Sequence, residues 1–164
     1  MFMIIGIDPG QTGSLVAMKR DGTILDTLLM PTIKIGTKTR VNGAAIAAWL
    51  EEVQSSWNCM WYAYLEKVGP MPKQQASSSF SFGHAAGLVE GVLTGAGISL
   101  TLVSPQAWKK HAGLIGTDKD VARSRAVQLY PGCRMLDQKG KGQAIADALL
   151  IARYGLSCEP GGSI

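Results

Sequence analysis

The chain has 164 residues, of which 46% are hydrophobic and 17% are charged. These values exclude a disordered chain and are typical of one globular domain that is large enough to bury a core. The formal net charge of +4 favours an anionic partner, although many basic proteins bind no nucleic acid.

Cysteine usage and hydropathy indicate the compartment. Cys59, Cys133 and Cys158 form no Cys-x-x-Cys pair, which argues against a zinc site and favours a reducing cytoplasm. No apolar run reaches the roughly 18 residues that a membrane span needs, and no basic region precedes the first apolar run. We therefore expect a cytoplasmic protein with no membrane attachment, built as one domain over residues 1–156 with a short tail at 157–164.

The start of the chain predicts three antiparallel strands. An apolar run ends abruptly in Asp8, and Pro9-Gly10 opens a tight turn before a second strand at 14–19. Asp21-Gly22 is a hairpin signal before a third strand at 24–30. Asp8 would lie at the carboxyl edge of a central strand, where open sheets expose their chemistry. The alternative is an Asp that only begins a hairpin turn.

A loop and a packing helix follow. Residues 31–40 are polar and basic and predict a loop. Asn42 predicts the cap of a helix over 43–54 that buries Ile46, Leu50 and Val53 on one stripe.

A second acid ends the next predicted strand. Residues 59–65 are rich in aromatic side chains and run into Glu66, which is followed by a loop that carries Lys73. Ser77, Ser78 and Ser79 predict the cap of a helix from Phe80 to Gly95. Glycines recur on one face of this helix at 83, 87 and 91. We expect this row to pack tightly on the sheet; a dimer contact or the passage of a DNA strand are the alternatives.

Positive charge is concentrated late in the chain. Residues 98–103 predict a strand, Ser104 caps a short helix, and a second helix runs from 117 to 130. Between residues 105 and 141 the basic residues are Lys109, Lys110, Lys119, Arg123, Arg125, Arg134, Lys139 and Lys141. This cluster predicts the surface that binds an anionic partner.

The last predicted helix, residues 143–154, is apolar on all sides and therefore buried. Asp147 is its only ionisable side chain before Arg153, and a buried carboxylate needs a partner. A salt bridge to a lysine would satisfy Asp147 alone. A divalent cation shared with Asp8 and Glu66 explains all three acids, because Mg²⁺ prefers carboxylate oxygens.

These features, taken in order, resemble RuvC, the Holliday junction resolvase of the RNase H-like superfamily. The resemblance rests on residues 6–14 after the first strand, Leu65-Glu66, the basic segment from Pro105 to Lys119, and residues 142–149 of the last helix. It spans nearly the whole chain. The small size and the loop after Glu66 are most similar to phage and prophage versions.

The resemblance implies an α/β RNase H-like fold. Its mixed five-stranded sheet has antiparallel strands one to three and helices on both faces. It also implies a homodimer that cuts branched DNA, the four-way junction, by paired nicks. Asp8, Glu66 and Asp147 match the metal-binding catalytic positions, and Lys109 and Lys119 match basic positions near the scissile strand.

The mechanism that we expect is two-metal phosphodiester hydrolysis with Mg²⁺, for which Mn²⁺ can substitute. In this hypothesis Asp8 is shared by both ions, Glu66 and Asp147 each complete one site, and Lys119 offsets charge on the phosphoryl oxygens. The DNA backbone would be bound by Lys73, Lys109, Lys110, Lys119, Arg123, Lys139 and Lys141.

Two departures from the family pattern stand out. Many relatives carry a fourth acid or a histidine one helical turn before the last Asp, where this chain has Ala144, with Gln143 as a weak substitute. Some relatives carry an aromatic wedge soon after the catalytic Glu; here Gly69 stands in that loop, so Met71, Phe80 or Phe82 would have to serve.

Other function classes remain open at this point. An ATP-handling protein of the kinase type could use the opening motif, but that fold closes around nucleotide with two domains and this chain has room for one. A nonenzymatic junction-binding protein is favoured if Ala144 abolishes metal affinity. The alternative that differs least from the expected function is a related nuclease that acts on flaps or RNA hybrids.

Overall fold

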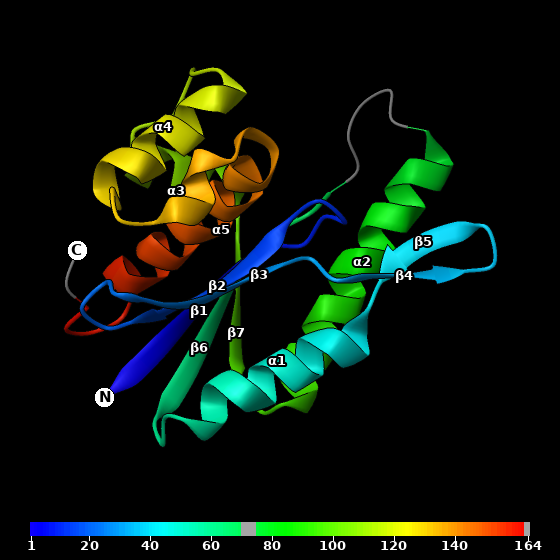
Figure 1. Ribbon diagram of the computed structural model, residues 1–164, viewed down its shortest axis with the longest axis horizontal. Helices are drawn as coiled ribbons and strands as arrows, with labels where there is room; N and C mark the ends of the chain where they lie inside the picture. The colour runs from blue at the N-terminus through cyan, green and yellow to red at the C-terminus, as the bar shows by residue number, and fades with distance from the viewer. Residues whose placement is uncertain (70–74, 163–164) are drawn as a thin grey trace.

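The structure is a computed structural model that describes residues 1–69 and 75–162, with Lys119 described by its backbone alone. Figure 1 shows the elements along the chain. They are β1 (Phe2–Asp8), β2 (Ser14–Lys19), β3 (Ile24–Leu29), β4 (Thr32–Ile35), β5 (Lys38–Val41), α1 (Gly43–Ser55), β6 (Met60–Glu66), α2 (Ala76–Gly95), β7 (Ser99–Val103), α3 (Pro105–Ala112), α4 (Lys119–Leu129), a 3₁₀ turn η1 (Arg134–Asp137) and α5 (Lys139–Cys158).

The main sheet is mixed, as predicted, with strand order β3-β2-β1-β6-β7. β1, β2 and β3 are antiparallel neighbours, whereas β1, β6 and β7 run parallel. β1 lies at the centre because its side chains are apolar on both faces: Ile4, Ile5 and Ile7 are all fully buried. The carboxyl ends of the three parallel strands therefore meet at one edge of the sheet.

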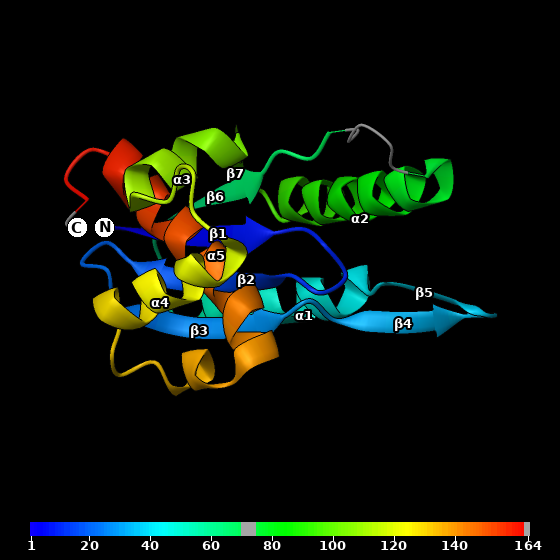
Figure 2. The same ribbon diagram turned by 90° about the horizontal axis from the view of Figure 1, so that it is seen from above.

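Helices cover both faces of this sheet (Figures 1 and 2). The alternation along β1 separates two cores, because Ile4 packs among α3, α4 and α5 while Met3, Ile5 and Ile7 pack toward α1 and α2. The predicted α/β architecture is confirmed, and none of the described helices is long and apolar enough to cross a membrane.

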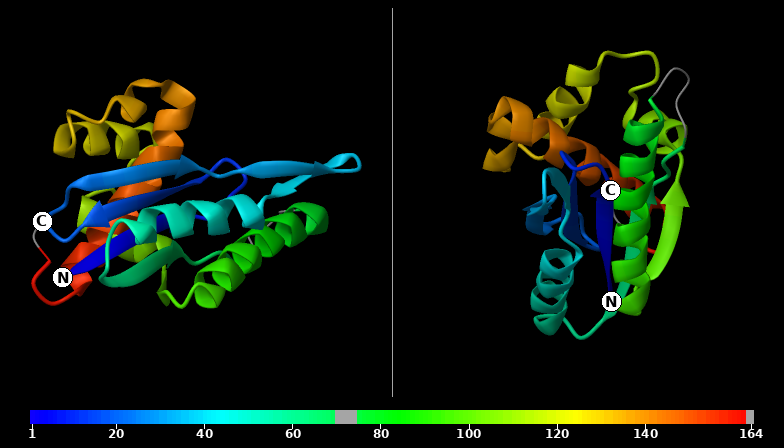
Figure 3. Two further views of the ribbon diagram at one scale, coloured as in Figure 1. Left: turned by 60° about the horizontal axis from the view of Figure 1, so that its bottom comes forward. Right: turned by 90° about the vertical axis from the view of Figure 1, so that its right-hand side faces the viewer.

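The predicted loop at residues 31–40 is wrong, since this segment forms the β4–β5 hairpin. The two strands pair antiparallel, from Thr32 opposite Val41 to Ile35 opposite Lys38, around Gly36 with φ of 62°. β-Branched residues alternate with basic ones here, and that alternation stabilises a strand even where the composition is polar. Figure 3 shows the hairpin extending beyond the main sheet.

α5 lies directly against β1. A side chain at Gly6 would overlap the backbone of Ala148 and Ala152, so glycine is required for this approach. Ser14, which is fully buried, donates its hydroxyl to the Ala144 carbonyl at 2.9 Å. The helix runs from Lys139 to Cys158, four residues beyond the prediction at each end. At its amino end, Gly140 and Gly142 lie within the helix and do not stop it.

The other predicted helices form with altered boundaries. Asn42 caps α1 as predicted, its side chain accepting a hydrogen bond from Ala45 N at 3.2 Å. α2 begins at Ala76, so Ser77 to Ser79 lie in its first turn and do not cap it. The glycine row at 83, 87 and 91 does not pack on the sheet: these glycines are exposed, and no atom lies within 4 Å of a Cβ placed on them.

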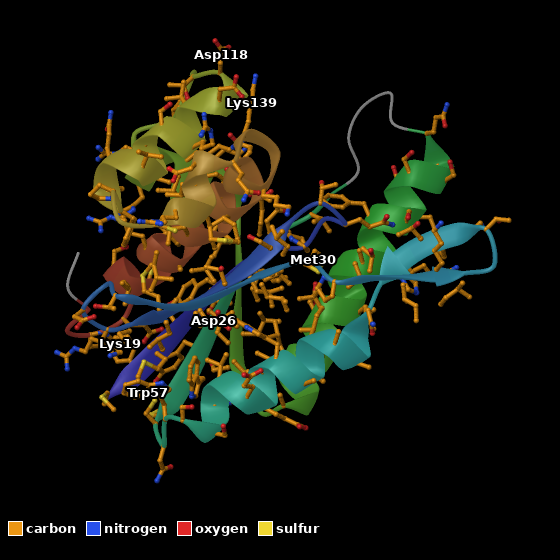
Figure 4. The ribbon with its side chains drawn as sticks, in the orientation of Figure 1. Lys19, Asp26, Met30, Trp57, Asp118 and Lys139 are labelled. Atoms are coloured by element: carbon orange, nitrogen blue, oxygen red, sulfur yellow. The ribbon has the colours of Figure 1, made fainter. Side chains whose placement is uncertain are left out.

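Two tryptophans, one on α1 and one just after it, contact charged side chains of β2 and β3. Lys19 Nζ lies 4.5 Å from the centre of the Trp57 ring, and Trp49 Nε1 donates to Asp26 Oδ2 at 2.7 Å (Lys19, Trp57 and Asp26 are labelled in Figure 4). These contacts close the sheet onto α1 far from the acids that end β1 and β6.

The contact between α5 and β1 predicts the effect of Gly6→Ala. The new methyl group would meet helix backbone that cannot move aside, so we expect a loss of at least about 3 kcal/mol in the free energy of unfolding, measured by urea denaturation. Gly140→Ala is the matched control: it lies in a helix facing open space and should stabilise slightly or leave stability unchanged. Equal stability of the two variants would contradict the close packing.

Candidate functional site

Asp8 and Glu66 are neighbours at the carboxyl edge of the sheet. β1 and β6 pair in parallel register with Ile7 beside Leu65, so each strand presents its acid at the same level. Gly10 N donates to Asp8 Oδ1 at 3.3 Å. Gly13 follows closely behind, where a side chain would overlap the Asp8 backbone. The turn therefore holds the first carboxylate in place with main-chain groups.

α5 brings the third acid to this edge. Ala148 lies over Gly6 on β1, so Asp147, one residue earlier, is placed near the end of the strand. Gln143, one turn before it, donates Nε2 to Asp147 Oδ1 at 3.2 Å. The three acids come from two strands and one helix, and the fold gathers them across more than 130 residues of sequence.

The pKa values show that the three carboxylates interact. The pKa of Asp147 is raised to about 7, mainly by burial and then by the charges of Asp8 and Glu66, while Lys109 and the Gln143 hydrogen bond oppose the shift. Burial and then Asp8 raise the pKa of Glu66. Burial also raises the pKa of Asp8. The charge of Lys109 lowers the pKa of Glu66 and of Asp147 but offsets the effect of burial only in part, so the negative charge of the site is incompletely compensated.

Trp108 is the residue that the sequence analysis missed. Its indole Nε1 donates to Glu66 Oε2 at 2.6 Å, and this bond holds the pKa of Glu66 lower than burial alone would. The ring is only 1% exposed. The available signal was chemical: a large indole on the buried face of a short helix needs an acceptor for its N–H.

A cavity of about 370 Å³ opens between the sheet edge and the layer of α3, α4 and α5. Asp8, Lys109, Asp118, Gln143 and Asp147 line it. Glu66 is not among the residues that line the cavity, and its carboxylate accepts the hydrogen bond from Trp108. Figure 4 labels Asp118 and Lys139 on the outer part of the helical layer, away from the sheet.

The donor chemistry fits a hard divalent cation. Besides the carboxylates, Gln143 Oε1 is buried and has no hydrogen-bond partner. Buried oxygens without partners are costly unless something compensates them, and carboxylate and amide oxygens are ligands that Mg²⁺ and Ca²⁺ accept. In residues 1–69 and 75–162, however, no three His, Cys, Asp or Glu side chains are gathered closely enough to hold an ion as they stand.

The predicted DNA-binding residues separate into three groups. Lys109, Lys110, Lys139 and Lys141 are exposed on α3 and on the first turn of α5. Arg123 is half-buried and donates Nη1 to the Leu136 carbonyl at 2.8 Å, so it braces η1. Lys73 and the side chain of Lys119 lie outside the described residues.

The candidate wedge residues are also distinguishable. Met71 lies outside the described residues. Phe80 is 70% exposed. Phe82 is half-buried, and its ring lies 3.5 Å from a Cβ placed on Gly10, so it packs against the turn that follows Asp8.

Comparison with known proteins relates this architecture to resolvases. No known protein-family model matches the chain. Over 124 residues it is 32% identical to the chloroplastic Holliday junction resolvase MOC1 of Chlamydomonas reinhardtii, a match that covers 74% of this chain but 14% of that protein's length.

Two solved structures superpose on nearly the whole chain. RuvC of Thermus thermophilus in complex with a Holliday junction substrate matches with a TM-score of 0.61 at 18% identity, covering 95% of this chain and 94% of that one. Another Thermus thermophilus RuvC structure matches with a TM-score of 0.58 at 19% identity, covering 95% of each chain. The predicted RNase H-like fold is confirmed.

The raised pKa of Asp147 predicts how stability depends on pH without metal. The folded state binds the proton below about pH 7, whereas the unfolded chain binds it only below about 4. The contribution of Asp147 to stability in EDTA should therefore be complete below about pH 4 and be lost as the pH rises from about 4 through 7, with Asp8 and Glu66 adding to the loss.

Asp147→Asn removes one of the crowded charges. In EDTA at pH 8 we expect an equal or higher melting temperature, and a loss of stability between pH 5 and pH 8 that is smaller by about 2 to 4 kcal/mol. Asp118→Asn, an exposed acid on the rim of the same cavity, should leave the pH dependence as it is. Strong destabilisation by Asp147→Asn in EDTA would instead indicate a salt bridge to a lysine.

Proposed function

We propose, from the premise that this chain has the RuvC fold, that it is a structure-selective endodeoxyribonuclease that resolves four-way DNA junctions. The observation that carries the proposal is the set of three carboxylates, Asp8, Glu66 and Asp147, at one edge of the sheet. Each has a pKa raised by burial, and the charge of Lys109 offsets the shifts of Glu66 and Asp147 only in part. Three crowded carboxylates are costly to maintain, and a metal-dependent reaction on a phosphodiester explains why they are there.

In this proposal Asp8, Glu66 and Asp147 would hold Mg²⁺, or Mn²⁺ in its place. Bound there, the ions would supply a water of lowered pKa and stabilise charge on the scissile phosphate. The chain supplies orientation: Trp108 holds Glu66, Gly10 N holds Asp8, and Gln143 holds Asp147. Each bond restricts one carboxylate before the substrate arrives.

The basic side chains around the cavity suit the DNA backbone. Lys109 lines the cavity itself, and Lys110, Lys139 and Lys141 are exposed beside it on α3 and α5. Their charge would position phosphates without reading bases. We assign Lys119 to the charge that develops on the phosphoryl oxygens, because its backbone begins α4 next to Asp118 on the rim.

We further propose a homodimer. A four-way junction has two-fold symmetry, and two matched nicks need two active sites. The glycines at 83, 87 and 91 leave one face of α2 open, which would allow a second copy to approach closely.

The three cysteines are free, which fits the reducing cytoplasm of a bacterial or phage-infected cell.

A second candidate is a protein that binds junctions and does not cut them. Two points favour it: Ala144 stands where the resemblance to RuvC implies a further ligand, and no ready set of three metal-binding side chains exists in the described part of the chain. The two candidates differ only in whether the bound junction is cleaved.

The decisive experiment is a cleavage assay on labelled four-way junction, linear duplex, flap and RNA hybrid, with Mg²⁺, Mn²⁺ or EDTA. We expect symmetric nicks in the junction with either metal, little cleavage of duplex, and none in EDTA. Asp8→Asn should reduce cleavage by at least about 10³-fold with junction binding retained. Metal-independent binding of the junction without nicks would support the second candidate. Preferential cutting of flaps or RNA hybrids would identify those nucleic acids, and not the four-way junction, as the substrate.

Gln143 offers a test of the metal site that does not depend on activity. We propose that its unpartnered Oε1 takes part in binding the ion where Ala144 cannot. Gln143→Ala should weaken Mn²⁺ binding by about 10-fold in titration calorimetry, and should reduce the rise in melting temperature that Mg²⁺ produces. Gln138→Ala, exposed at the amino end of the same helix, is the matched control and should change neither quantity.

A further inference from the structure

A polar cleft separate from the catalytic cavity lies between the β4–β5 hairpin and the first half of α2. This cleft has a volume of about 510 Å³. Its lining includes the polar or basic side chains of Gln11, Lys38, Arg40, Ser77, Ser81 and His84. Figures 1 and 3 show the hairpin running beside α2 on the side of the sheet away from α3, α4 and α5. The cleft is therefore separate from the basic segment formed by residues 105–141.

The cleft carries positive charge without any acid. None of its lining residues is Asp or Glu. The sequence extends this pattern, because no acid occurs between Asp26 and Glu51 or between Glu66 and Glu90. The hairpin and the first half of α2 thus present Lys34, Lys38 and Arg40 with no carboxylate from either element to offset them. An uncompensated basic groove attracts a polyanion.

The hairpin directs two of its cations into the cleft and one away from it. Lys38 and Arg40 are two residues apart on β5, so their side chains leave the same face, and both line the cleft. Lys34 is paired with Thr39 and lies on the other face. The spacing of Lys38 and Arg40 along an extended strand, roughly 7 Å, is close to the distance between successive phosphates in a nucleic-acid strand.

Arg40 is fixed in place without losing its charge. Its Nη1 lies 3.2 Å from His84 Nε2, and because a guanidinium can only donate, the imidazole nitrogen must accept. The bond anchors the hairpin to α2 and orients the guanidinium, and none of the described residues that line the cleft is a carboxylate. An oriented, unpaired guanidinium is the group best suited to phosphate oxygens.

The cleft is connected directly to the catalytic turn. Gln11, three residues after Asp8, donates Nε2 to the Thr39 carbonyl at 3.1 Å and contacts Ser81 Oγ at 3.4 Å. Phe82 packs on the same turn at Gly10. A strand of nucleic acid lying in the cleft would therefore continue toward Asp8.

We propose that this cleft binds the backbone of one arm of the DNA substrate, with phosphates on Lys38 and Arg40. The site lies across the catalytic edge from Lys109 and Lys110. The inference deepens the proposed function and rests on it, since it assumes that DNA is the substrate. The charge of the cleft selects DNA over a second copy of this chain, whose formal net charge is also positive.

The test measures the salt dependence of junction binding by fluorescence anisotropy in EDTA, where no cleavage occurs. For the double variant K38A/R40A we expect affinity to fall at least about 10-fold near 0.1 M salt. The log–log salt slope should become shallower by about 2, one unit for each phosphate that the variant no longer binds. K34A, the matched control on the other face of the same hairpin, should keep the wild-type slope. K38R should keep it too, because the charge remains.

Three outcomes would overturn the inference. One is a double variant whose slope equals that of K34A. The second is a K38A/R40A variant that sediments as a monomer where the wild type is a dimer, with the salt slope of junction binding unchanged; this result would assign the cleft to a second copy. The third is wild-type protein that binds no junction, which removes the proposed function as well. If the wild type cleaves the junction and the K38A/R40A variant keeps the wild-type salt slope, only the proposal about the cleft is refuted. If the wild type binds the junction without cleaving it, only the proposed nuclease activity is refuted.

Discussion

The contact between α5 and β1 is the constraint on which the rest of the site depends. A helix can lie this close to a central strand only because Gly6 has no side chain. The buried hydroxyl of Ser14, at the start of β2, then donates a hydrogen bond to the Ala144 carbonyl of the helix. Asp147 is thereby placed beside two acids that the parallel pairing of β1 and β6 has already brought level. A small shift of the helix along the strand would separate the carboxylates, so backbone packing determines the chemistry of this edge.

Placing three carboxylates at the boundary of an apolar core opposes stability. Burial raises all three pKa values, and their mutual repulsion adds to the shift at Asp147 and Glu66. The fold offsets part of this cost with donors that orient the acids without neutralising them: Trp108 on Glu66, Gln143 on Asp147 and Gly10 N on Asp8. A neighbouring lysine in contact would be more stabilising, but it would also occupy the oxygens. The site therefore combines orientation with retained negative charge, which is what binding a cation requires.

The two sides of the catalytic edge are built differently. On one side, short helices present lysines around the acidic cavity, and Arg123 is used to brace η1. On the other side, an extended hairpin anchored through Gln11 and His84 presents an acid-free groove. The acids thus lie between two positive surfaces, so a polyanion can approach from both sides while a cation is attracted only to the centre.

Local sequence patterns determined the elements of this protein, and long-range contacts decided how they are used. Strand alternation, the Asp21-Gly22 turn and the caps Asn42 and Ser104 act within a few residues, so β1 to β3, α1 and α3 were predictable, as were acids at the ends of β1 and β6. The β4–β5 hairpin was mistaken for a loop because polar composition masked β-branched alternation. The exposed face of α2, the bond from Trp108 to Glu66 and the true ends of α5 depend on partners 40 or more residues away or on packing around glycine. Periodicity in one segment carries no information about such partners; only the tertiary structure, by choosing which surfaces exclude water together, decided them.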